Sequence, residues 1–172
     1  MADPRFGTTR GHVAAMFALW GPEEATKFLR TLEQNGLVTV LGNAHAVRMT
    51  AQGEVLCCMT DTDDVRVAQA NGEPVKMVYP DMGDGGTLLI PNTVALVKGA
   101  PHGEAARKLV DYLVSAEVER RLAQSTSGNF PVRDDLLAEL GMKRPAASAL
   151  SFDAIADAMP EAIEAARAIL GE

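Results

Sequence analysis

Apolar residues along this chain fall into two kinds of pattern that alternate with one another. Short unbroken apolar runs bounded by Gly, Asn or Asp predict buried strands, and longer segments with apolar positions three or four apart predict helices. We expect strands at 37–41, 55–59, 75–79, 87–90 and 93–97. We expect helices at 9–20, 22–34, 44–52, 62–71, 103–114, 116–124 and 150–170, the last interrupted at Pro160. This alternation predicts an α/β protein with a doubly wound sheet.

The regular alternation changes after Pro80. Residues 81–86 form a loop of Gly and Asp with one Met, which is the clearest candidate for a domain boundary or hinge. A chain of 172 residues favours one domain or a domain and a half. We therefore expect the segments before and after this loop to belong to different parts of the fold.

Bulk composition narrows the class of protein. With 47% hydrophobic and 23% charged residues, the chain has the balance of a globular protein with a substantial core. A net charge of −7 without any Lys/Arg run argues against a nucleic-acid partner. No apolar run is long enough to span a bilayer, so we expect a chain that is not membrane-embedded. Residues 1–7 lack the charged-then-apolar pattern of a signal peptide.

The two cysteines, Cys57 and Cys58, are adjacent in the predicted strand 55–59. Neighbouring cysteines fit neither a disulfide framework nor a tetrahedral zinc pattern. We expect both to be small apolar residues inside a buried strand.

An acidic cluster follows the predicted strand 55–59 and opens the next helix. Asp61, Asp63 and Asp64, with two threonine hydroxyls beside them, offer hard oxygen donors and negative charge, which suit a metal ion or an amine. The same position has a structural explanation, because Asp and Thr are common N-caps and acidic residues in a first turn complement the helix dipole. Capping accounts for one carboxylate, so we favour a binding role for the cluster.

Two further helix starts carry weaker signals for an anion. Residues 7–12 combine glycines, hydroxyls and an arginine at a helix N-terminus, where backbone N–H groups attract negative charge. A glycine followed by asparagine repeats the arrangement at 42–43, although capping alone explains such a pair. The candidate anion-binding residues are Thr8, Thr9, Arg10, Gly11 and Asn43. Because strand-to-helix transitions line one edge of a parallel sheet, we expect them to converge with the acidic cluster.

The sequence contains no recognisable catalytic set. His12, His45 and His102 are scattered, and none lies in a Ser/His or Cys/His context. We expect His12 to be a packing residue. The acidic cluster could hold Mg²⁺ for phosphoryl chemistry, which keeps a small metal-dependent hydrolase or phosphotransferase as an alternative. The lysine and the glycine-rich phosphate loop that accompany such a site are missing.

The order of these motifs resembles the second half of bacterial ABC-transporter solute-binding proteins, in particular the ferric-iron-type group with the type II periplasmic-binding-protein fold. The matching segments are GTTRGH at 7–12, LEQNG at 32–36, GNA at 42–44, GEV at 53–55 leading to TDTDD at 60–64, IPNTVALVKGAPH at 90–102, EAARKLVDYL at 104–113 and PVR at 131–133. They span nearly the whole chain, and as a set they are fairly specific.

The resemblance implies a two-lobed receptor that traps its ligand in the cleft between the lobes. Residues 1–80 and 141–172 would form the second lobe, and residues 81–140 would cross back into the first. In ferric-binding relatives the loop at the start of the helix holds a synergistic anion, and the corresponding residues here are Thr8, Thr9, Gly11 and Asn43. The resemblance thus implies a metal ion such as ferric iron as ligand, an ABC permease as partner, a periplasmic location and no enzymatic activity.

Two departures from the family pattern refine this expectation. Iron-binding relatives present two adjacent tyrosines where this chain has Asp63 and Asp64, and carboxylates suit an amine as well as a hard metal. The first half of a full receptor is not in the sequence, which would leave strand edges and an apolar helix face uncovered. We expect either a homodimer through the exposed partial lobe or weak function. A further alternative is a lobe that binds no ligand and serves only as an interaction domain.

Overall fold

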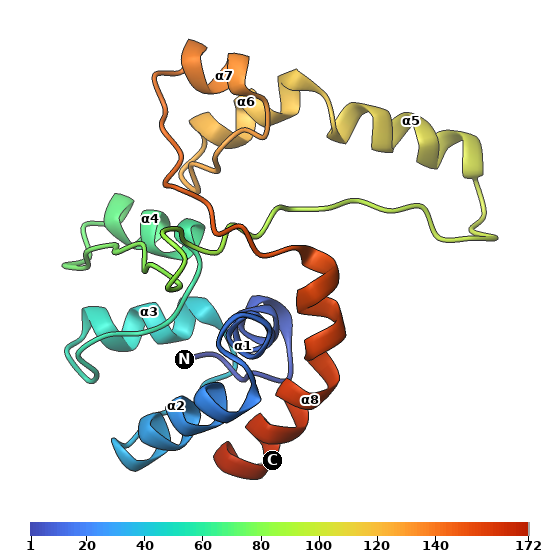
Figure 1. Cartoon of the computed structure of the whole chain (residues 1–172). Coiled ribbons are helices and arrows are strands. Elements are labelled where there is room, and N and C mark those ends of the chain that lie inside the picture. The colour runs from blue at the N-terminus through green and yellow to red at the C-terminus, as the bar shows by residue number, and fades with distance from the viewer. Residues whose placement is uncertain (172) are drawn as a thin grey trace. The chain divides into compact units, whose positions relative to one another are not determined.

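The computed structural model describes residues 1–171 (Figure 1). Contacts divide the chain into two compact units, unit 1 with Met1–Leu89 and Pro145–Glu172, and unit 2 with Ile90–Arg144. The lobe assignment expected from the sequence, 1–80 with 141–172 and 81–140, stays a prediction, because it concerns the lobes of a whole receptor.

Helices dominate both units. Unit 1 contains α1 (Gly7–Trp20), α2 (Pro22–Gln34), α3 (Asn43–Ala51), α4 (Thr62–Ala70) and α8 (Phe152–Leu170). Unit 2 contains α5 (Gly103–Leu113), α6 (Ala116–Gln124) and α7 (Asp134–Glu139). All the expected helices are confirmed, with ends that differ by no more than two residues, whereas the six-residue α7 was not expected. Within residues 1–171, no helix combines the length and the hydropathy of a membrane span.

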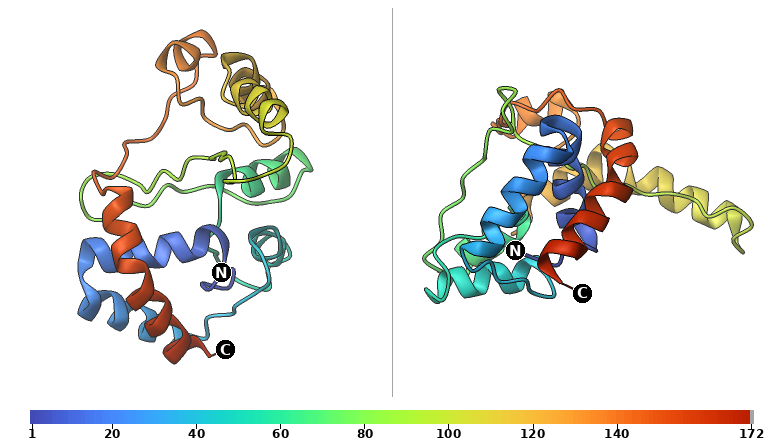
Figure 2. Two further views of the ribbon diagram at one scale, coloured as in Figure 1. Left: turned by 90° about the vertical axis from the view of Figure 1, so that its right-hand side faces the viewer. Right: turned by 60° about the horizontal axis from the view of Figure 1, so that its bottom comes forward.

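The core of unit 1 is a bundle of α1, α2 and α8, which pack against one another (Figure 1, Figure 2). Val13 and Phe17 of α1, Leu29 of α2, and Ile155 and Ala162 of α8 belong to one buried cluster. All residues of α1 from Val13 to Phe17 are buried, so this helix is covered on more than one side. Its neighbours therefore fix the position of α1, including its N-terminus.

The expected interruption of the last helix at Pro160 is wrong. α8 continues through this proline from Phe152 to Leu170. Proline removes one backbone N–H donor and crowds the preceding turn. However, the helix buries Ile155 before the proline and Ala162 after it in the same core. We infer that burial on both sides of Pro160 outweighs the lost hydrogen bond.

The doubly wound sheet is not formed within residues 1–171. Strand-type pairing there is limited to two isolated parallel bridges, Ala2 with Val40 and Thr87 with Ala147. The expected strand 55–59 has no strand neighbour in the described chain, and its Leu56 is fully exposed. Strands are stabilised by pairs of side chains and backbone groups on neighbouring strands, so an apolar run forms one only where a partner lies beside it. The sheet therefore stays a prediction.

The expectation that both cysteines are buried is also wrong. Cys57 is exposed and Cys58 is half-buried. The expected burial depends on a strand inside a sheet, and among residues 1–171 no strand lies beside this segment.

Unit 2 has a small core and a large exposed apolar surface. Leu136 and Leu137 of α7 are buried, and Arg133 just before α7 pairs with Glu119 of α6. By contrast, α5 buries none of its residues, and its Leu109 is 56% exposed. The uncovered apolar helix face expected from the sequence is therefore present, while the homodimer stays a prediction.

Replacing Ser151 with alanine is expected to lower the free energy of unfolding of unit 1 by about 1 kcal/mol. The Ser151 hydroxyl oxygen accepts a hydrogen bond from the backbone N–H of Ala154 at 3.2 Å, which caps α8. Urea denaturation followed by the fluorescence of Trp20, the single tryptophan, measures the change. Ser151→Asp keeps a capping oxygen and is the control, so an equal loss in both variants would contradict the role of the cap.

Candidate functional site

Three helix N-termini of unit 1 are joined by Thr8, Asn43 and Asp61, which we call the polar junction. Thr8 lies in the first turn of α1, Asn43 begins α3, and Asp61 is the N-cap of α4. The Thr8 hydroxyl donates to Asp61 Oδ2 at 2.9 Å. The Asn43 side-chain nitrogen donates to the same oxygen at 2.7 Å and to Thr8 Oγ1 at 3.0 Å. The structure therefore brings these three residues together, and their role in binding stays a prediction.

The orientation of the Asn43 amide follows from its neighbours. If its oxygen and nitrogen were exchanged, Asn43 Oδ1 would face the carboxylate of Asp61, and two acceptors would meet. In the observed orientation Asn43 Oδ1 is buried and has no hydrogen-bond partner among the described residues, and the same holds for Thr60 Oγ1. Buried polar atoms without a partner are uncommon in folded proteins. The region around the junction therefore has hydrogen-bonding capacity that the described chain does not use.

The helix ends at the junction are not capped by their own N-cap side chains. In the described chain, none of Phe6, Gly42 and Asp61 makes a side-chain cap for α1, α3 or α4. The first N–H groups of a helix have no intrahelical acceptor, and the helix dipole makes this end positive. Three such ends at one place favour an anionic group.

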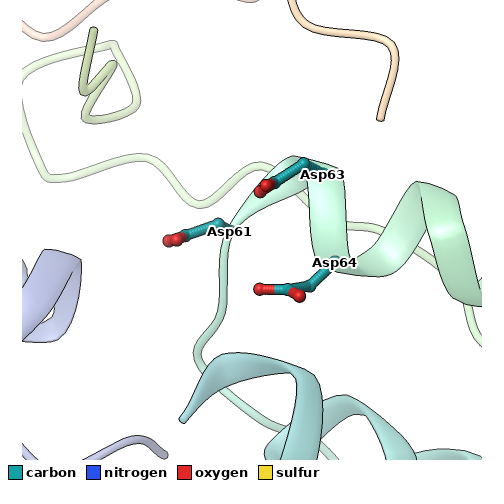
Figure 3. Close-up of side chains that lie close together, drawn as sticks. All are labelled: Asp61, Asp63 and Asp64. Atoms are coloured by element: carbon teal, nitrogen blue, oxygen red, sulfur yellow. The ribbon is translucent and has the colours of Figure 1, made fainter. Parts of the chain in front are cut away.

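The acidic cluster adjoins the junction at the start of α4. One oxygen of each carboxylate of Asp61, Asp63 and Asp64 lies within 4.8 Å of the others. Figure 3 shows the three side chains pointing to the same side of the helix start. Burial, followed by the charges of Asp63 and Asp61, raises the pKa of the Asp64 carboxyl above its ordinary value. The cluster therefore concentrates negative charge at a half-buried site.

The remaining candidates on α1 are less clearly connected to the junction. Thr9 is 2% exposed, so its side chain lies in the interior, and a role in binding would fall to its backbone N–H. Arg10 is exposed and Gly11 is half-buried. The proposed anion-binding roles of these three residues stay predictions.

His12 is a neighbour of the site that the sequence pattern does not reveal. It lies one helical turn after Thr8 on α1 and is half-buried. Burial lowers the pKa of His12, and the nearby charge of Asp61 opposes this shift only in part. The lowered pKa favours the neutral imidazole beside the Asp61 carboxylate, and the expected packing role of His12 stays a prediction.

The residues of this site lie in a segment that matches a known protein family. The family described as "Bacterial extracellular solute-binding protein" has a model that matches residues 7–149. The matched segment includes the polar junction, the acidic cluster and all of unit 2.

Individual relatives match the chain over part of their length. Two proteins, from Salmonella typhi and Salmonella typhimurium, carry the name "Putative 2-aminoethylphosphonate-binding periplasmic protein" and are 30% identical to the chain over 124 and 112 residues. These matches cover 70% and 63% of this chain but 36% and 33% of the relatives. An uncharacterized protein from Haemophilus influenzae is 31% identical over 118 residues, which are 68% of this chain and 33% of that protein. The chain thus spans about a third of the length of the curated relatives it matches, and no solved structure matched it.

Proposed function

The chain belongs to the bacterial extracellular solute-binding proteins, and we propose that it contributes to the solute-binding site of an ABC importer. The proposed solute is a small zwitterion of the 2-aminoethylphosphonate type. Asp63 and Asp64 would hold its ammonium group, and the N-termini of α1, α3 and α4 would hold its anionic group. The observation that carries this proposal is the polar junction, which joins three helix N-termini beside the acidic cluster.

The acidic cluster supports the ammonium half of this proposal. Burial raises the pKa of Asp64, and the charges of Asp63 and Asp61 raise it further, so a bound cation would relieve the repulsion between the carboxylates. An ammonium group has N–H donors and no acceptor, whereas ionised carboxylates are acceptors only. The two therefore match in both charge and hydrogen bonding.

The helix N-termini support the anionic half, and Asp61 explains why the solute should be zwitterionic. The N–H groups at helix N-termini favour an anion, but the Asp61 carboxylate that joins these helix starts would repel a solute that carries negative charge alone. A second, positive group that reaches Asp63 and Asp64 offsets this repulsion. 2-Aminoethylphosphonate, which appears in the names of the Salmonella relatives, carries a phosphonate and an amine on one short chain.

A hard metal ion is the second candidate for the acidic cluster. Three carboxylate oxygens within 4.8 Å of one another could surround such an ion. In that case the helix N-termini would hold a synergistic anion, as the resemblance to ferric-iron receptors implies. The names of the relatives mention no iron. We therefore rank a metal ion after a zwitterionic solute.

The other expectations follow from membership in the family. An ABC permease as partner and a periplasmic location belong to the proposal, because the chain covers about a third of its relatives. Solute-binding proteins are in general not enzymes, so the family does not favour the hydrolase or phosphotransferase alternative. If no solute binds, the alternative is that the chain serves only as an interaction domain.

Titration calorimetry and thermal melts with a matched set of solutes test the proposal. 2-Aminoethylphosphonate is expected to bind, and at a hundredfold excess over Kd it should stabilise the chain by about 2.7 kcal/mol. Ethylamine and ethylphosphonate each carry one half of the solute and should bind much more weakly. If ethylphosphonate bound as tightly as 2-aminoethylphosphonate, the proposed ammonium contact would be contradicted. Binding of ferric citrate or Mg²⁺ alone would favour the metal site, and no response to any solute would contradict both.

A further inference from the structure

The two connections between unit 1 and unit 2 are tied together inside unit 1. The chain passes from one unit to the other at 89–90 and returns at 144–145. On the outgoing connection, the N–H of Thr87 donates to the carbonyl oxygen of Ala146 at 2.8 Å. On the returning connection, the N–H of Ser148 donates to the carbonyl oxygen of Thr87, also at 2.8 Å. These two bonds form one of the isolated parallel bridges.

Asp84 adds side-chain contacts at the same place. Its carboxylate accepts hydrogen bonds from the N–H of Gly86 at 3.2 Å, from the Ser148 hydroxyl at 2.7 Å and from the N–H of Ala149 at 3.0 Å. These bonds, first of all the one from Ser148, hold the pKa of the Asp84 carboxyl below its ordinary value. One charged side chain thus joins the loop 81–86 to the returning connection.

The loop 81–86 is also fixed by contacts with α1 and with itself. The indole N–H of Trp20 in α1 donates to the carbonyl oxygen of Met82 at 2.7 Å. The N–H of Met82 donates to the carbonyl oxygen of Gly86 at the same distance. A Cβ on Gly86 would collide with the backbone of the returning connection, so glycine is required for this close approach. The glycines of this loop therefore serve a tight, anchored turn.

Beyond these contacts, Leu88 still packs against the core of unit 1 and the Arg144 side chain pairs with Asp134, but the backbone of the two connections is far less constrained. Among the described residues, no backbone–backbone hydrogen bond involves 88–96 on the outgoing connection or 143–145 on the returning one. Every residue of 90–100 is exposed. Segments with exposed and unpaired backbone open at low free energy.

We propose that the loop 81–86, whose composition suggests a hinge, acts instead as a clamp that fixes both connections to unit 1. The crossover clamp consists of residues 82–87 and 146–149, with Trp20 beneath them and Asp84 as the side chain that links the two connections. The flexible joints of the chain then lie at 90–96 and 143–145. This inference concerns the connections themselves and does not depend on which solute binds.

Hydrogen exchange of the full chain tests the clamp without a ligand. In the parent chain, the amides of Thr87, Ser148 and Ala149 are expected to exchange more slowly than those of 90–96. Asp84→Ala is expected to raise the exchange rate of Ala149 by about tenfold, because the N–H of Ala149 loses a charged acceptor. Exchange at Ser148, whose N–H donates to Thr87, should rise as well, because the returning connection loses its link to Asp84.

Asp81→Ala is the matched control. It removes a carboxylate from the same loop, but the contacts of Asp81 are with the N–H groups of Gly83 and Gly85 inside that loop. Exchange at 146–149 should therefore stay at the parent rate. Should Asp84→Ala not fold, Ser148→Ala keeps the Asp84 charge but removes the hydroxyl that donates to Asp84 and accepts from the N–H of Leu150. This variant is expected to raise exchange at Ala149 about threefold. If the parent amides of Thr87, Ser148 and Ala149 exchanged as fast as those of 90–96, or if the Asp84 and Asp81 variants had equal effects, the proposal would be overturned.

Discussion

A chain in which Asp63 and Asp64 are both replaced by asparagine is expected to bind 2-aminoethylphosphonate about 100-fold more weakly than the parent, or weaker still. Asparagine keeps the size of the side chain and removes its charge, so each position would lose the charge-assisted hydrogen bond to the ammonium group that we propose for it. Such bonds contribute about 1.5–3 kcal/mol, and about 1.4 kcal/mol corresponds to a factor of ten in Kd. Titration calorimetry of both chains at neutral pH measures the change.

Exposed carboxylates elsewhere in unit 1 provide the control. Glu33→Gln with Glu73→Gln removes the same amount of charge from exposed positions and is expected to leave Kd unchanged. Without ligand, Asp63→Asn/Asp64→Asn should melt at or above the parent temperature, because it relieves repulsion between neighbouring carboxylates. A parent-like Kd would show that the acidic cluster does not hold the ammonium group. Lost binding together with a lower melting temperature would indicate damage to the fold instead.

The raised pKa of Asp64 adds a pH dependence to the same prediction. Burial and the charges of Asp63 and Asp61 keep a proton on Asp64 up to a higher pH than on an ordinary aspartate. As the pH falls through this raised pKa, the carboxyl group becomes neutral and attracts an ammonium group less strongly. Affinity should therefore begin to fall at a higher pH than in a site built from ordinary carboxylates, and Asp63→Asn/Asp64→Asn should lack this part of the dependence.

The helices could be predicted from the sequence because their signals are local. Pro22 at the first position of α2, with Glu23 and Glu24 in its first turn, marks a helix start through neighbouring residues alone. Pro160 misled the same kind of argument, because the burial that keeps α8 continuous comes from α1 and α2. The short α7 has only Leu136 and Leu137 as buried residues, and adjacent positions carry no helical period.

The strands could not be predicted from local signals, because a strand forms only where a second segment pairs with it. Leu56 lies in an apolar run typical of a buried strand, yet it is fully exposed where no neighbouring strand is found among residues 1–171. The chain spans about a third of the length of its relatives, and an apolar run carries no information on whether its partner lies within that third. The crossover clamp could not be predicted from local patterns either, because Asp84 and Ser148, which share a hydrogen bond, lie 64 positions apart in the sequence.

The members of the polar junction were predictable, although the argument for their convergence was only partly right. The sequence placed Thr8, Asn43 and Asp61 at strand-to-helix transitions along a sheet edge. In the structure they meet through hydrogen bonds between helix N-termini, while no sheet is formed within residues 1–171. Polar residues at helix starts are a local signal, so the identities could be read from sequence. The distances could not, nor could the Asn43 oxygen that finds no partner among residues 1–171, because both depend on how α1, α3 and α4 are placed.

Leu29→Ala is expected to lower the free energy of unfolding of unit 1 by about 3 kcal/mol, the middle of the range for a buried leucine. Leu29 is 1% exposed and lies in the buried cluster with Val13 and Phe17. Its truncation leaves a cavity where three helices meet, and close-packed interiors relax only partly into such space. Urea denaturation followed by Trp20 fluorescence measures the loss. Leu109→Ala makes the same change at a 56% exposed position and should stay within about 0.5 kcal/mol of the parent.

The same variant separates packing from recognition. The buried cluster around Leu29 contains none of Thr8, Asn43 and Asp61, and effects at sites without shared partners usually add. At a temperature where Leu29→Ala remains folded, its Kd for 2-aminoethylphosphonate should therefore equal that of the parent. If Leu29→Ala weakened binding as strongly as Asp63→Asn/Asp64→Asn, the junction would depend on how tightly α1 is packed rather than on its own hydrogen bonds. Losses of affinity at the acidic cluster could then no longer be assigned to the carboxylates alone.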